Sequence, residues 1–102
     1  MSLTANNVSI VCYDIANDKL RRVIEKCLRD FGARLQYSVF ICRLDADGMA
    51  LCREKLTKVV TAHQRLKTPS DSLIVFERIS PAAAGCLLGG RFDYDEPAYG
   101  VV

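Results

Sequence analysis

Asp14 is the residue whose position points most directly to chemistry. It closes the apolar run "VSIVCYD", and Lys19, Arg21 and Arg22 follow it closely. A carboxylate at the end of a buried strand is costly unless a cation meets it. Asp14 could cap the following helix or pair with Arg21 or Arg22, or it could bind a metal ion. One Asp is a poor Mg²⁺ site, but a two-fold dimer that brings together Asp14 of two chains would make a sufficient one.

Basic residues are the second group with a possible function. They are concentrated on the two predicted helices or just after the second: Lys19, Arg21, Arg22, Lys26, Arg29, Arg53, Lys55, Lys58, Arg65 and Lys67. They could simply be the solvated faces of amphipathic helices. They could also bind phosphates, with Arg21 and Arg34 near enough to the strand ends to reach a phosphate at Asp14.

Aromatic residues and the single histidine allow two interpretations each. Tyr13, Tyr37 and Phe40 could stack on nucleic-acid bases, or they could belong to the core, as aromatic residues in strands often do. His63 could be a general base, or it could interact with the dipole at the end of the second helix.

Other reaction classes have little support. Gly85, Gly89 and Gly90 form neither a dinucleotide-binding pattern nor a phosphate-binding loop, and one histidine cannot support a Ser/His/Asp argument. The acidic "DYDE" (Asp93 to Glu96) could bind a cation or form a solvated tail.

Composition predicts one small soluble domain. The chain has 102 residues, half of them apolar, and a net charge of +2, which neither requires nor excludes a polyanionic partner. Its five cysteines include no C-x-x-C pair, so free thiols in a reducing cytoplasm are expected. No apolar run approaches the ~20 residues that span a bilayer, so no membrane association is expected.

Hydrophobic periodicity predicts the order of the elements. Residues 8–14 have the composition of a buried strand, and the stripe that begins at Leu20 and ends at Phe31 predicts a helix that Asn17 or Asp18 caps. Gly32 is expected to end this helix in the left-handed conformation. Residues 33–44 predict one strand or two strands broken near Gln36, a second helix should run to about Leu66, and residues 72–79 predict a further strand.

This order predicts an α+β sandwich. Both helices should cover one face of an antiparallel sheet in the βαββαβ, ferredoxin-like arrangement. The predicted organisation is a flexible extension over 1–7, the ferredoxin-like domain over 8–80, and a C-terminal segment over 81–102 that could contribute a strand to a dimer.

Two segments together resemble a known family. "YDIANDKLRR" and "LQYSVFICRL" look like the two signature segments of the small CRISPR-associated Cas-two family, and "DSLIVFERI" resembles its last core strand. The resemblance implies a homodimer in which Asp14 of each chain is catalytic and holds a shared Mg²⁺ or Mn²⁺ ion. By position it also implies that Tyr13, Arg21, Arg34 and Phe40 contribute to nucleic-acid binding or activity.

Three functions stay open at this point. The first is a metal-dependent endonuclease acting on single-stranded RNA or double-stranded DNA during CRISPR spacer acquisition. The second is a structural adaptor that binds duplex DNA and the Cas-one integrase without cleavage. The third is a small regulatory module that binds a metabolite and no nucleic acid.

Overall fold

The computed structural model of the protein describes residues 8–79. The elements in this part are β1 (Val8–Asp14), α1 (Asp18–Arg29), β2 (Ala33–Gln36), β3 (Val39–Cys42), α2 (Ala46–Ala62), a short 3₁₀ turn η1 (Gln64–Leu66) and β4 (Ser72–Ile79). The predicted order of strands and helices is confirmed, with residues 33–44 divided into two strands. The extension predicted over 1–7 and the segment predicted over 81–102 lie outside the described residues.

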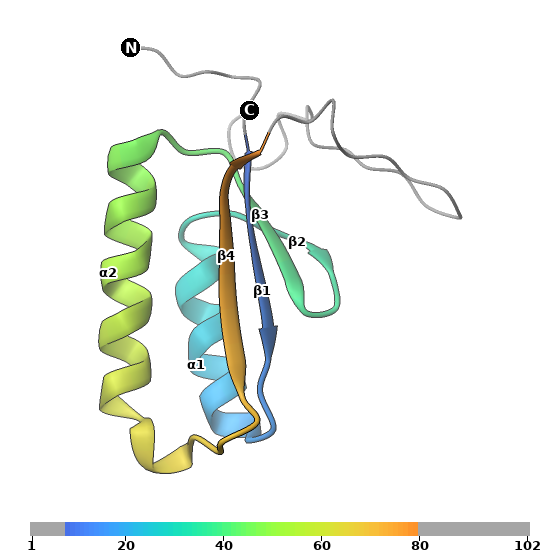
Figure 1. The fold of residues 1–102 in the computed structure, drawn as a ribbon, viewed down its shortest axis with the longest axis vertical. Coiled ribbons are helices and arrows are strands. Elements are labelled where there is room, and N and C mark those ends of the chain that lie inside the picture. Colours follow the sequence, from blue (N-terminus) through green and yellow to red (C-terminus); the bar gives the residue numbers. More distant parts are fainter. Residues whose placement is uncertain (1–7, 80–102) are drawn as a thin grey trace.

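The strands form one antiparallel sheet in the order β2-β3-β1-β4. Both helices lie on the same side of this sheet (Figure 1). The prediction of an α+β fold with a four-stranded antiparallel sheet and two helices is therefore confirmed.

The core lies between the sheet and the helices. Its centre joins Leu20, Ile24 and Leu28 of α1, spaced at helical intervals, to residues of α2, β1 and β3. The buried contributions of those three elements are Met49, Cys52, Leu56, Val11, Tyr13, Phe40 and Cys42. Asn17 caps the start of α1, because its side-chain oxygen accepts a hydrogen bond of 3.0 Å from the Leu20 amide. The helix predicted to run to Leu66 ends at Ala62 and continues as η1.

The prediction for Gly32 was wrong in its physical reason. Its φ does not lie in the left-handed region, and α1 ends at Arg29, with the capping residue Asp30 in a right-handed conformation. Glycine is needed because a Cβ at this position would lie 2.2 Å from the Ile41 carbonyl oxygen of β3. The constraint is thus a close backbone approach, which helical periodicity in the sequence cannot reveal.

The opposite face of the sheet has no helix over it in the part of the chain described. Directly opposed residues in an antiparallel pair share a face, so Ile10 lies beside Phe76, and Cys12 beside Ile74 and Val39. Phe76 and Ile74 are 50% and 48% exposed. We call this surface, made by Ile10, Cys12, Val39, Ile74 and Phe76, the helix-free face.

The cysteines within residues 8–79 are free thiols, as predicted: Cys12, Cys27, Cys42 and Cys52. Cys86 lies outside the described residues. Neither helix in this part of the chain has the length and apolar character that crossing a membrane would need.

Replacing Gly32 with Ala should destabilise the fold. The added methyl group would collide with the Ile41 carbonyl, and overpacking of this kind costs about 1–3 kcal/mol. Urea denaturation followed by circular dichroism measures the change in the free energy of unfolding. An unchanged value would show that β3 does not approach Gly32 this closely in solution.

Candidate active site

Asp14 is the last residue of β1 and lies opposite Ser72 of β4. The alternation of side chains along the strand puts it on the same side of the sheet as Cys12 and Ile10, at the end of the helix-free face. The residue is exposed, and within residues 8–79 its carboxylate takes part in no hydrogen bond or ion pair. The carboxylate is therefore available to a cation from outside the described chain.

The alternative roles considered for Asp14 are filled by other residues. Asn17, not Asp14, caps α1. Arg21 donates a hydrogen bond of 3.0 Å to the Ile15 carbonyl oxygen and forms an ion pair with Asp18. Neither Arg21 nor Arg22 pairs with Asp14. A capping or internally paired acid thus does not explain this carboxylate.

Asp71 holds the backbone around Asp14 in place. Its carboxylate accepts hydrogen bonds from the amides of Ala16, at 3.1 Å, and Thr68, at 2.9 Å, and from the Thr68 hydroxyl at 3.0 Å. The backbone bonds from Thr68 and then Ala16 hold the pKa of the Asp71 carboxyl below its ordinary value. Asp71 therefore ties the connection after β1 to the turn before β4.

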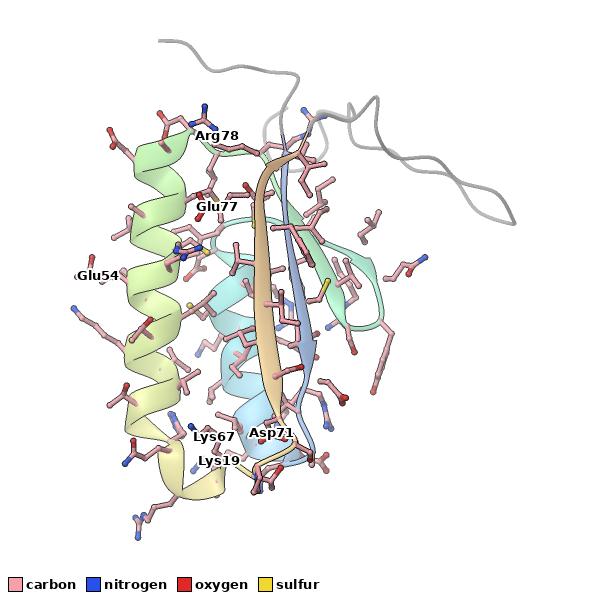
Figure 2. The ribbon with its side chains drawn as sticks, viewed as in Figure 1. Lys19, Glu54, Lys67, Asp71, Glu77 and Arg78 are labelled. Atoms are coloured by element: carbon pink, nitrogen blue, oxygen red, sulfur yellow. The ribbon has the colours of Figure 1, made fainter. Side chains whose placement is uncertain are left out.

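Figure 2 shows Asp71 together with Lys19 and Lys67 at this end of the molecule. Sequence reasoning missed Asp71. Its signal was the Thr-x-x-Asp spacing of Thr68 and Asp71, which is typical of a side chain that bonds a nearby backbone amide.

Tyr13 precedes Asp14 but points to the opposite side of the sheet, toward the helices. It is 4% exposed, and its hydroxyl donates a hydrogen bond of 2.6 Å to Glu25 of α1. Burial, followed by the hydrogen bond with Glu25, raises the pKa of Tyr13 to about 12. The hydroxyl therefore stays protonated at neutral pH and serves as a donor.

Arg34 joins this group from β2. One guanidinium nitrogen lies 3.3 Å from a Glu25 carboxylate oxygen, another donates to the Tyr37 carbonyl, and the guanidinium carbon lies 5.3 Å from the centre of the Phe40 ring. The Arg34 guanidinium also lies 3.4 Å from the Tyr13 hydroxyl. We call Tyr13, Glu25, Arg34 and Phe40 the arginine cluster. Its contacts fix Arg34 in one position.

The structure brings Tyr13, Arg34 and Phe40 together but leaves Asp14 on the other face of the sheet. Phe40 is 0% exposed, so its ring and that of Tyr13 belong to the core and present no face to a base in this conformation. Any part they play in nucleic-acid binding would act through Arg34, and such binding stays a prediction. Glu25 was missed by sequence reasoning, although it lies one turn after Arg21 among the basic residues of α1.

His63 lies at the C-terminal end of α2. Its Nδ1 lies 2.8 Å from the Val59 carbonyl oxygen, so this nitrogen donates to the end of the helix. The contact agrees with the helix-end interpretation of His63.

A metal site cannot be completed by the described residues of one chain. Residues 8–79 contain no group of three or more His, Cys, Asp or Glu side chains that could hold a metal ion. Asp14 therefore offers one carboxylate, and further ligands would have to come from outside this part of the chain.

Comparison with known proteins identifies the family. Residues 7–79 match the family described as CRISPR associated protein Cas2. A CRISPR-associated endoribonuclease Cas2 from Rhodospirillum rubrum is 50% identical over 34 residues, 33% of this chain and 27% of its own length. Another, from Chloroflexus aurantiacus, is 36% identical over 56 residues, 55% of this chain and 60% of its own length. The chain thus matches less than two thirds of each of these relatives.

A crystal structure of a hypothetical protein from Thermus thermophilus has a similar fold. Its TM-score is 0.60 at 28% identity, over 83% of this chain and 93% of the other. Because the family match spans all of the described residues, the chain belongs to the CRISPR-associated Cas2 family, as the two signature segments predicted.

Replacing Asp71 with Ala should lower the stability in a pH-dependent way. A carboxyl whose pKa is lower in the native state stabilises the fold above its ordinary pKa, and this contribution is lost as the pH falls through the lowered native value. The melting temperatures of wild type and Asp71→Ala should therefore differ most at neutral pH and converge as the pH falls through the lowered native pKa of Asp71. Asp30→Ala, which removes another exposed carboxylate, is the control. A difference that does not change with pH would contradict the role given to the Asp71 charge.

Proposed function

We propose that the protein is a divalent-metal-dependent endonuclease that hydrolyses phosphodiester bonds of single-stranded RNA, double-stranded DNA or both. It would act in CRISPR spacer acquisition as a ferredoxin-like homodimer in the prokaryotic cytoplasm. Family membership and the endoribonuclease names of the relatives support this assignment. The observation that carries it is the exposed carboxylate of Asp14 at the end of the helix-free face, which forms no hydrogen bond or ion pair within residues 8–79.

The residues present fit a metal ion shared between two copies. Carboxylate oxygens are the ligands that Mg²⁺ and Mn²⁺ prefer, and Mg²⁺ is commonly held by one or two carboxylates with water completing its shell. The Asp14 carboxylates of two copies would supply these ligands. When bound, the ion would activate water and neutralise charge on the scissile phosphodiester.

The helix-free face supports the homodimer. A soluble protein rarely leaves an apolar sheet face uncovered, and Ile74 and Phe76 are each about half exposed. In a two-fold dimer the same patch of both copies meets itself. Because Asp14 lies at one end of this face, a second copy seated on it could bring the two carboxylates close together. A strand from residues 81–102 would be an additional part of this interface.

Arg21 and Arg34 would bind the substrate phosphates. Both guanidinium groups are held by contacts within the chain, Arg21 by Ile15 and Asp18, and Arg34 by the arginine cluster. A guanidinium has five N–H donors, so each retains donors for a phosphate. Fixing them before binding reduces the entropy lost when substrate arrives. Tyr13 and Phe40 would contribute by holding Arg34.

The alternative function is a structural adaptor that binds duplex DNA and the Cas-one integrase without cutting. The observation that favours it is the row of exposed cations along α1, Arg22, Lys26 and Arg29, which extends away from the Asp14 end of the helix. Such a row suits a long polyanion better than a single scissile phosphate.

Asp14→Ala should remove cleavage while leaving the fold intact. Labelled single-stranded RNA and duplex DNA are incubated with Mg²⁺, with Mn²⁺ and with chelator. Wild type should cut only with metal, and the variant should be slower by roughly 100-fold or more, because it lacks the metal ligand. Asp30→Ala should cut like wild type. If wild type does not cut, and Asp14→Ala binds duplex DNA and the integrase equally well, the adaptor function replaces the nuclease.

Ile74→Glu should disrupt the dimer. A charge on the helix-free face would be buried without a partner on association. Leu51→Glu is the matched control, since Leu51 is 46% exposed on α2 and Ile74 is 48% exposed on β4. Sedimentation velocity should give a dimer for wild type and Leu51→Glu, and mainly single chains for Ile74→Glu. If both variants remain dimers, the two subunits do not meet through the helix-free face.

A further inference from the structure

Tyr37 is the most exposed large apolar side chain within residues 8–79, with 76% of its surface accessible. It occupies the two-residue turn, Tyr37 and Ser38, between β2 and β3. The amide of Tyr13 donates to the Ser38 carbonyl at 3.1 Å, so this turn lies beside the end of β1 that carries Asp14.

The turn does not have the local chemistry that usually makes a two-residue hairpin. Such hairpins favour Asn-Gly or Gly-containing turns with positive φ. Among the described non-glycine residues only Arg78 has a positive φ, so Tyr37 and Ser38 do not adopt a turn of this kind. A register shift between Arg34 and Gln36 accompanies the turn. Contacts from elsewhere in the chain must therefore hold its conformation.

The arginine cluster supplies these contacts. The Tyr37 carbonyl accepts a hydrogen bond from Arg34 and lies 3.3 Å from the Tyr13 hydroxyl, and Glu25 holds both of those side chains. The backbone of Tyr37 is thus anchored to the core while its ring stays in solvent. A preorganised exposed aromatic ring loses little entropy when a flat ligand stacks on it.

A cation lies at the same end of β1 as this turn. The Arg21 guanidinium donates a hydrogen bond of 3.0 Å to the carbonyl of Ile15. Ile15 is two residues after Tyr13, whose amide bonds to Ser38 of the turn. An aromatic ring beside a guanidinium offers the two contacts that one nucleotide needs, a stacking face for the base and a donor for the phosphate.

We infer that Tyr37 is a stacking platform for an unpaired base of a single-stranded nucleic acid, and that Arg21 binds the adjacent phosphate. The inference rests on the proposed function in that the ligand is a nucleic acid. It goes further by naming an unpaired base as the group that is recognised. Bases inside a duplex are stacked on one another and present only their edges. The surface of Tyr37 selects single-stranded segments of RNA or DNA without a strong base preference.

The test measures stacking directly and without metal. Single-stranded RNA and DNA oligonucleotides carrying one 2-aminopurine are titrated with full-length protein in chelator, which prevents metal-dependent cleavage. Stacking quenches 2-aminopurine fluorescence. Wild type and Tyr37→Phe should quench it and bind with affinities within about twofold of each other, whereas Tyr37→Ala should lose the quenching and bind roughly 5- to 100-fold more weakly. Leu51→Ala, which truncates another exposed apolar side chain, should behave like wild type.

An oligonucleotide with an abasic site in place of 2-aminopurine completes a double-mutant cycle. Wild type should bind this oligonucleotide more weakly than the one that carries 2-aminopurine. Tyr37→Ala should bind the two oligonucleotides with similar affinity, because the lost ring and the lost base stabilise each other. Equal losses for the two oligonucleotides, or unchanged affinity of Tyr37→Ala, would overturn the inference. So would a change in sedimenting mass or melting temperature that accounts for the loss, since Tyr37 would then belong to an interface or to the fold.

The inference and the proposed function can fail separately. Tyr37-dependent quenching without metal-dependent cleavage would retain the stacking platform and remove the nuclease. Metal-dependent cleavage with an unchanged KM for Tyr37→Ala would retain the nuclease and remove the platform.

Discussion

The alternation of side chains at the end of β1 is the constraint on which the rest of the site depends. Tyr13 points to the helices and Asp14 to the other side of the sheet, because successive residues of a strand face opposite ways. Pairing with β3 and β4 on both sides fixes this register. A slip by one residue would bury the carboxylate and expose the phenol. One strand thus supports both a packed cluster and an exposed acid.

Two carboxylates outside the predicted site stabilise its two sides. Asp71 ties the connection after Asp14 to the turn before β4, and Glu25 joins the Tyr13 hydroxyl to the Arg34 guanidinium. Both charges are satisfied by donors within the chain, which distinguishes them from Asp14. Of these three carboxylates, Asp71 holds the backbone, Glu25 holds two side chains, and Asp14 remains available for chemistry.

Local pattern was sufficient for most of the fold and for the position of Asp14. Strand and helix periods located the elements, and an acid after a buried strand identified the carboxylate. The prediction for Gly32 failed because the residue is constrained by its contact with β3, which follows later in the sequence. The sequence could not show whether Tyr13 and Phe40 are buried or exposed, since an aromatic residue in a strand suits either position. The role of Glu25 depends on α1 crossing Arg34, which only the packed structure specifies.

The proposed function gives the two faces of the sheet different tasks, and it would place the metal chemistry on the face where two copies would meet. Its central claim is that one metal ion is shared by two Asp14 carboxylates. Mn²⁺ binding measured by electron paramagnetic resonance, at known protein concentration and without nucleic acid, tests this directly. The account predicts one tightly bound ion for every two chains, and none for Asp14→Ala. One ion per chain, or binding that survives the substitution, would contradict it.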